Sequence, residues 1–133
     1  MKIYGLVFII AFVLNIIWEH AHSLLYVSYR GAEITEYILF RAAFFDAAVI
    51  TLCAYLFLII PVLKNKLWIM IFALTLFATG LELWALEGGR WMYAESMPII
   101  PFINTGLTPT IQLGLLFYFT LYFTQKFKIW YDA

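Results

Sequence analysis

The chain has 133 residues, of which 65% are hydrophobic, 20% aromatic and only 12% charged, and its mean hydropathy is +0.94. A soluble domain has about 45–50% apolar and about 25% charged residues, so this composition excludes a soluble monomer and predicts one integral membrane domain over residues 1–133. Eight basic residues balance eight acidic ones, so charge gives no argument for a nucleic-acid partner, and we expect none.

Four apolar runs predict an all-α, four-helix membrane bundle. A helix that crosses about 30 Å of hydrocarbon needs about 20 apolar residues. The runs, bounded by charges, Pro or Gly, are residues 3–26, 38–60, 67–86 and 101–123. The link over residues 61–66 is short and contains Pro61 and two lysines, so the second and third runs should form an antiparallel hairpin.

The distribution of basic residues predicts the orientation of the bundle. With the N-terminus inside, the outer loops hold only Arg30 and Arg90. The inner segments then hold Lys2, Lys64, Lys66, Lys126 and Lys128. Because Lys and Arg are enriched on the inner side, we predict that both termini lie inside. An aromatic belt at the helix ends is expected from Trp18, Trp68, Trp84, Trp91, Trp130, Tyr26, Tyr29, Tyr93 and Tyr131.

The first run has a second interpretation. Lys2, the apolar stretch and Ala21-His22-Ser23 imitate the three parts of a secretory signal peptide over residues 1–23. We favour a membrane crossing, because the polar residues that end the run look like part of a site. The single Cys53 excludes an internal disulfide and a Cys-based metal site.

Polar side chains gather in the outer half of the predicted bundle. An ionisable group within a crossing costs at least about 2.5 kcal/mol, and such groups usually face the bundle interior or a wet cavity. Several in one layer therefore predict one shared pocket. The layer comprises Asn15, Glu19, His20, His22, Arg41, Asp46, Glu82, Glu87, Asn104, Thr105, Thr108 and Gln112.

Helical spacing groups some of these side chains. One face of the first run carries Asn15, Trp18, Glu19 and His22. Arg41 and Asp46 are five residues apart and do not share a face, so we expect each to pair with another helix rather than with each other.

Glu19 and His22 have three open interpretations: a local ion pair, a proton-transfer pair or part of a metal site. His20 should point elsewhere, because two residues separate helical side chains by about 200°. Asp46 has a structural interpretation, as the partner of Arg90 of the loop or of Arg41 in a second copy, and a functional one.

The connector over residues 88–98 is unlike an ordinary loop. It mixes Arg90 and Glu95 with Trp91, Met92, Tyr93 and Met97, and we expect it to fold over the outer mouth of the bundle. Pro98, Pro101 and Pro109 interrupt the entry into the fourth run. Pro109 frees a carbonyl, which predicts either a broken helix beside the polar layer or a plain kink.

These motifs together resemble an uncharacterised group of small bacterial four-helix membrane proteins. The matching segments are Asn15-x-x-Trp18-Glu19-x-x-His22-x-x-Leu25-Tyr26, Asp46, Glu82, Gly89-Arg-Trp91-Met-Tyr93-x-x-x-Met97-Pro98 and Gly106-Leu-Thr-Pro109-Thr-Ile-Gln112. The resemblance spans most of the chain and implies a multi-pass protein of the bacterial inner membrane.

A partial resemblance, over residues 82–123, is to the membrane-bound lycopene cyclases, the small-subunit type of carotenoid cyclase. It is carried by Glu82, Trp84-Ala85, Gly89-Arg-Trp91 and Tyr93. Where those cyclases have Pro-x-Glu-Glu, this chain has Pro109-Thr110-Ile111-Gln112. The resemblance implies a polyprenoid substrate.

The first functional hypothesis is an intramembrane enzyme that isomerises or cyclises a polyprenoid or another lipid. A protonated carboxylic acid would give its proton to an alkene, and aromatic faces would stabilise the resulting cation. The catalytic candidates are Glu19, His22, Asp46 and Glu82. The substrate-binding candidates are Asn15, Trp18, Arg41, Trp91, Tyr93, Asn104 and Gln112. This chemistry requires no cofactor and no metal.

The second hypothesis is a non-enzymatic membrane protein, either a lipid- or solute-binding module or a small carrier. Four short helices leave little room for a transport path, so a carrier requires a homo-oligomer. Residues 41–48, rich in alanine, would form its contact face. An assembly factor or a subunit of a larger complex is the third alternative.

Overall fold

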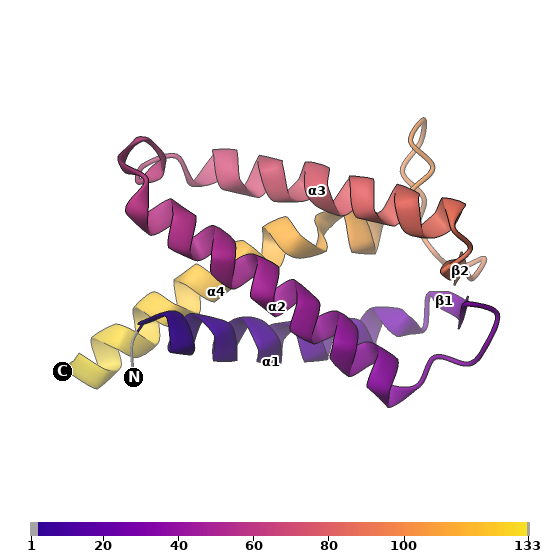
Figure 1. Ribbon diagram of the computed structural model, residues 1–133, viewed down its shortest axis with the longest axis horizontal. Coiled ribbons are helices and arrows are strands. Elements are labelled where there is room, and N and C mark those ends of the chain that lie inside the picture. The colour runs from indigo at the N-terminus through magenta and orange to yellow at the C-terminus, as the bar shows by residue number, and fades with distance from the viewer. Residues whose placement is uncertain (1–2, 133) are drawn as a thin grey trace.

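The computed structural model describes residues 3–132, with side chains described as far as Lys128. Lys2, used above for orientation, and Trp130 and Tyr131, assigned to the aromatic belt, lie outside these described side chains. Within this range the chain forms four α-helices and two short strands (Figure 1). In order they are α1 (Ile3–Ser23), β1 (Tyr26–Tyr29), α2 (Glu36–Ile59), the 3₁₀ turn η1 (Pro61–Leu63), α3 (Leu67–Glu87), β2 (Trp91–Tyr93) and α4 (Leu107–Asp132).

Three of the helices in the described range, α1, α2 and α3, are long and apolar enough to cross a membrane. Most of their surface faces outward, which suits a lipid environment; Ile17, Leu52 and Phe72 are examples of large exposed apolar side chains. α4 is the longest helix, but threonines and glutamines along it lower its apolar character. The fourth crossing therefore stays a prediction.

Local signals fix the ends of α2. The Thr35 side chain accepts a hydrogen bond from the Ile38 N–H at 3.3 Å, which caps the helix, and Glu36 places a negative charge in the first turn. At the other end Ile60 precedes Pro61, which cannot continue the helix. α2 and α3 then run in opposite directions, as the short link predicts, and diverge away from η1 (Figure 1).

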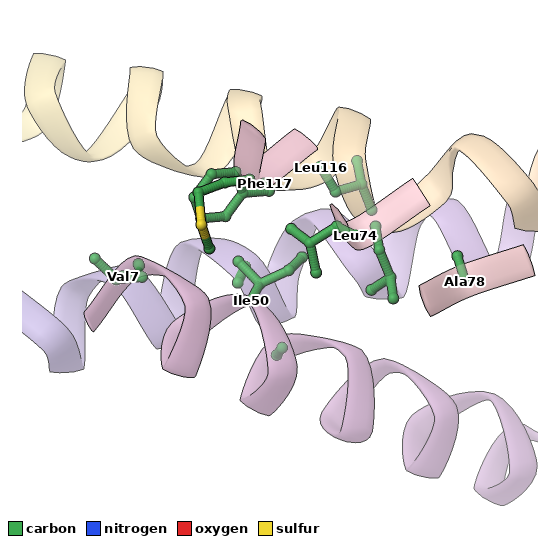
Figure 2. Close-up of a cluster of buried hydrophobic side chains, with 11 residues drawn as sticks. Val7, Ile50, Leu74, Ala78, Leu116 and Phe117 are labelled. Atoms are coloured by element: carbon green, nitrogen blue, oxygen red, sulfur yellow. The ribbon is translucent and has the colours of Figure 1, made fainter. Parts of the chain in front are cut away.

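The apolar core lies in the middle of the bundle, where α1 packs mainly on α2 and α3 mainly on α4 (Figure 2). Ala43, Ala47 and Ala54 on α2 are fully buried, and Ala47 packs in one cluster with Val7 and Ala11 of α1. The segment over residues 41–48 was expected to be a contact face between copies. Its central alanines instead bring two helices of the same chain close together.

A two-stranded antiparallel ribbon closes the end of the molecule opposite the termini (Figure 1). Tyr26 pairs with Tyr93 and Tyr29 with Trp91, with an irregularity between Tyr26 and Ser28. The first helix therefore ends at Ser23 rather than at residue 26, because the following residues are extended. The ribbon ties the α1–α2 connector to the α3–α4 connector.

The fourth helix begins at Leu107 rather than at residue 101. Residues 98–106 project from the bundle as a narrow loop (Figure 1), in which Phe102 and Asn104 have positive φ angles of 73° and 58°. Pro98 and Pro101 lack the N–H donors that a helix would use there. Pro109 lies in the first turn of α4, where an N–H has no helical partner, so it neither breaks nor kinks the helix.

Candidate functional site

A pocket of about 480 Å³ opens near the ribbon, between the diverging ends of α2 and α3. Apolar side chains such as Phe45, Leu81 and Leu113 form much of its wall. Six of the predicted polar residues also line it: Glu19, His22, Arg41, Asp46, Glu82 and Gln112. They come from all four helices, as the single-pocket prediction requires.

Gln112 of α4 is the hub of this cluster. Its Nε2 lies 2.7 Å from Oε1 of Glu19, 2.8 Å from Oδ2 of Asp46 and 3.1 Å from Oδ1 of Asn15. An amide nitrogen has two hydrogens, so it cannot satisfy three acceptors equally. The two carboxylates, which lie closest, take the strongest bonds.

Glu19 and Asp46 are therefore neighbouring carboxylates on one amide donor. Glu19 is buried and Asp46 is half-buried. The two side chains converge on this donor from different helices, Glu19 from α1 and Asp46 from α2. Asp46 bonds to Gln112 of α4, as expected of a partner on another helix. The same expectation is wrong for Arg41, which donates to Tyr29 of strand β1, because the ribbon and not a helix lies beside the start of α2.

The His22 ring connects α1, to which it belongs, with α4. Its Nε2 lies 3.1 Å from Oε2 of Glu19 and its Nδ1 lies 3.2 Å from Oγ1 of Thr108. Both members of the Glu19–His22 pair are buried. This geometry fits a local ion pair and a proton-transfer pair equally well, because either ring nitrogen can hold the proton. Among the residues the structure describes, no three His, Cys, Asp or Glu side chains are grouped so that they could hold a metal ion.

His20 points away from this cluster, as its position two residues before His22 predicts. Its Nε2 lies 2.6 Å from Oε2 of Glu36, at the start of α2. This pair is exposed, whereas the Glu19–His22 pair is buried. It joins α1 to α2 outside the pocket.

Glu82 is held by two phenols. Tyr93 and Tyr26, one from each strand of the ribbon, donate to its Oε1 at 2.5 Å and 3.1 Å. Burial, and the neighbouring Glu82, raise the pKa of both tyrosines, so these hydroxyls stay protonated and act as donors. Oε2 of Glu82 is not engaged by either phenol.

Aromatic rings cover the ribbon side of the pocket. The Trp91 ring lies 4.8 Å from the Tyr26 ring and 4.8 Å from the Tyr29 ring. Arg41, at the mouth, donates from Nη2 to the Tyr29 hydroxyl at 2.8 Å. This side of the pocket therefore offers π faces, which attract cations.

Some predicted site residues lie apart from the pocket wall. The Trp18 ring packs near His22, with ring centroids 6.1 Å apart, but does not line the pocket. Its buried Nε1 has no hydrogen-bond partner among the described residues. Asn15 acts through Gln112, and Tyr93 acts through Glu82. Asn104 is exposed in the projecting loop, away from the cluster, because the fourth helix starts after it.

Sequence reasoning placed Tyr29 in an aromatic belt, and Tyr26 in that belt and at the end of the first resemblance motif, but it made neither a site residue. It did not assign Arg30 or Arg90 to the pocket. All four line it. A signal for Tyr26 was present, since it follows His22 by four residues and so continues the polar stripe of α1. The pairing of β1 with β2 that brings the other three together has no local signal.

The arrangement can hold, release and accept protons next to an apolar cavity: three carboxylates, one imidazole and two phenols surround one space. Comparisons with protein-family models, with curated proteins and with solved structures give no match to this chain. Function is therefore argued from the geometry of the pocket.

Proposed function

We propose that the protein is an intramembrane acid–base enzyme that isomerises or cyclises an unsaturated lipid, with a polyprenoid as the preferred substrate class. The observation that carries the proposal is the convergence of Glu19, Asp46 and Glu82 on one pocket with largely apolar walls. A polar cluster of this kind is costly in lipid and usually has a functional reason.

The bundle is oriented with both termini inside, so that the pocket and the ribbon lie in the outer half of the bilayer. The positions of the lysines support this orientation, since Lys64 and Lys66 lie in the link at the same end of the bundle as the termini (Figure 1). The connector over residues 88–98 then lies over the outer mouth. We place the protein in the bacterial inner membrane, as a multi-pass protein.

The reaction begins at the Glu19–Asp46 pair. In this proposal the pair holds one proton, which moves from a carboxyl oxygen to one carbon of an alkene. An O–H bond breaks, a C–H bond forms and the adjacent carbon becomes a cation. His22, which is hydrogen-bonded to Glu19, tunes the acidity of this carboxyl group. The rings of Trp91, Tyr26 and Tyr29 stabilise the cation. Glu19 is the acid that donates the proton, and Asp46 is the second carboxylate of the pair.

Glu82 completes the reaction as the base. In an isomerisation it takes a proton from a neighbouring carbon, and the C–H electrons form the new double bond. In a cyclisation a second alkene first attacks the cation, a C–C bond forms, and the proton then leaves. Either way one proton enters and one leaves, so no oxidant or cofactor is consumed. Both phenols donate to Oε1 of Glu82, so Oε2 is the oxygen that accepts the proton in this step.

Packing below the pocket supports an enclosed lipid site over a transport path. The fully buried side chains of Ile50 and Phe117 lie in the apolar core of the bundle (Figure 2). Along α4, Phe117 lies between Gln112 of the polar cluster and the buried Thr120. A path for ions or solutes would need polar groups through this layer. The non-enzymatic alternative that remains is a module that binds a lipid in the same pocket without changing it.

Deuterium transfer from solvent tests the proposal. The purified protein is incubated in D₂O buffer with mixed unsaturated lipids, which are then analysed by mass spectrometry. Wild type should produce an isomer or cyclic product that carries one deuterium per turnover, and Glu82→Gln and Asp46→Asn should not. Glu95→Gln, which changes an exposed acid outside the pocket, is the matched control. A lipid that co-purifies with wild type but never gains deuterium would show that the protein is a binding module.

A further inference from the structure

Three arginines surround the mouth of the pocket. Arg41 comes from the second turn of α2, Arg30 from the turn after β1, and Arg90 from the turn before β2, and all three line the cavity. The Arg30 N–H donates to the Arg90 carbonyl at 2.8 Å, which fixes the two connectors next to each other. The fold thus gathers three positive charges from separate parts of the chain.

These guanidinium groups contact aromatic rings rather than acids. The guanidinium carbons of Arg30 and Arg41 each lie 5.6 Å from the centre of the Tyr29 ring, and that of Arg90 lies 3.6 Å from the Trp84 ring. Among the described residues the ion pairs are His20–Glu36 and His22–Glu19, and neither involves an arginine. Each guanidinium has five N–H donors, and most of these are available to a ligand.

The acids lie deeper in the same cavity. Asp46 follows Arg41 by five residues, which places it about 7.5 Å further along α2 at a rise of 1.5 Å per residue. Phe45 and Leu81 line the wall with them. The cavity therefore has a basic mouth, an apolar wall and an acidic floor, and an anionic ligand group can bind only at the mouth.

We propose that the mouth binds the phosphate headgroup of an amphiphilic lipid whose chain extends into the pocket. The planar guanidinium fork matches the geometry of phosphate oxygens, and an anion at the mouth offsets the positive charges of Arg30 and Arg41, which both lie against the Tyr29 ring. This inference rests on the proposed function, because that function places the reacting carbons of the chain beside the acids. The substrate class becomes a lipid phosphate that reacts close to its head.

Binding measurements in phospholipid-free, non-ionic detergent test the inference. The probes are geranylgeranyl phosphate, geranylgeraniol and inorganic phosphate, followed by native mass spectrometry and by tryptophan fluorescence. Wild type should bind the lipid phosphate at least about tenfold more tightly than the alcohol, since charge-assisted hydrogen bonds are the stronger ones. Equal affinity for the phosphate and the alcohol would overturn the inference. Inorganic phosphate that competes as well as the lipid phosphate would show a site for soluble phosphate and would also overturn it.

Arg41→Gln and Arg90→Gln remove one charge each and keep a polar side chain. Both should lose most of the preference for the phosphate over the alcohol, while they still bind the alcohol, which shows that the pocket is folded. Lys64→Gln, at the opposite end of the bundle, is the charge-matched control and should keep the full preference. A preference that survives in both arginine variants would contradict a headgroup site at the mouth.

The two proposals fail separately. If the lipid phosphate is preferred through Arg41 and Arg90 but no probe gains deuterium, the headgroup site stands and the catalytic proposal is wrong. If the alcohol gains deuterium as readily as the phosphate, the catalytic proposal stands and the headgroup inference is wrong. Glu82→Gln separates the readouts within one protein, since it should abolish deuterium transfer and leave the headgroup preference unchanged.

Discussion

The hydroxyl of Tyr93 lies 2.5 Å from Oε1 of Glu82, so the second strand of the ribbon is bonded directly to an acid of α3. The same hydroxyl accepts a hydrogen bond from the Gly106 N–H at 2.9 Å. One phenol therefore connects α3, β2 and the residue that precedes α4. Positions that could otherwise move independently are held around the pocket.

Replacing Tyr93 with Phe should destabilise the protein by about 1–3 kcal/mol, because a buried carboxyl loses a donor and a backbone N–H loses its acceptor. Tyr26→Phe should cost less, since its bond to Glu82 is longer at 3.1 Å and the Tyr93 bond remains. Thermal unfolding in detergent measures both changes. Tyr118→Phe, at an exposed position on α4, is the control. Equal effects of Tyr93→Phe and Tyr118→Phe would contradict the role of the Tyr93 hydroxyl.

Alkaline pH should destabilise the fold through the same two phenols. Burial raises the pKa of Tyr26 and Tyr93 above the ordinary value of 10.0. Above that pH the unfolded chain releases these protons and the folded chain keeps them, so the folded state binds more protons and stability falls as pH rises. The loss begins near the ordinary tyrosine pKa, and below it this contribution is fully present.

Ultraviolet titration of tyrosinate checks this prediction, since exposed tyrosines such as Tyr37 should ionise first and two phenols should ionise only at higher pH or on unfolding. The Tyr26→Phe/Tyr93→Phe double variant should lose the late-ionising group and show a shallower fall of stability with pH. A wild-type titration in which all nine tyrosines ionise together in the folded protein would rule out this linkage.

Gln112→Leu should lower stability by about 1–3 kcal/mol, because Glu19 and Asp46 both lose their shared donor. Asp46→Asn in the same chain should recover part of this loss, since the new amide can donate to Glu19 and one carboxylate is gone. Chemical denaturation of wild type, both single variants and the double variant forms a double-mutant cycle. We expect a coupling energy of about 0.5–3 kcal/mol, and an additive cycle would show that Gln112 and Asp46 act independently.

Two glycines of the helices should respond to alanine in opposite ways. A Cβ at Gly114 of α4 would lie 2.9 Å from Oγ1 of Thr75 and 3.1 Å from the Ile71 carbonyl oxygen, so Gly114→Ala should cost about 1–3 kcal/mol. At Gly80 of α3 a Cβ meets no atom within 4 Å, and Gly80→Ala should gain up to about 1 kcal/mol from helix propensity. Thermal unfolding compares the two. A stabilising Gly114→Ala would mean that α3 and α4 do not approach closely there.

The helices and the polar layer could be predicted from the sequence because both depend on local pattern. Apolar runs of membrane length define α1, α2 and α3, and the structure bears out these three elements. The spacing of Glu19 and His22 predicts that they share a face, and the structure pairs them on the buried side of α1. The sequence predicted that Asp46 and Arg41 each pair with another helix, which holds for Asp46 but not for Arg41, whose partner Tyr29 lies on a strand.

The ribbon and the start of α4 could not be predicted in the same way. β1 and β2 are each too short to show strand periodicity, and their pairing joins residues more than 60 positions apart in sequence. Tyr26 looked like the end of an apolar helix, although its hydroxyl binds Glu82. Residues 101–106 are apolar enough to suggest a helix, but the positive φ of Phe102 and Asn104 directs the chain into a loop.

The pocket lies between α2 and α3 at the ends that have diverged from the η1 link (Figure 1), so we expect the proposed lipid substrate to enter between these two helices. Phe45 of α2 and Leu81 of α3 line the cavity between these helices, which carry the exposed apolar surface of the bundle. A hydrocarbon tail that slides between them stays in the oily phase throughout, while its polar end moves along the bilayer surface. Under the proposed function, a lipid that reaches the pocket by this route would not have to be extracted into water, and its product would return directly to the bilayer.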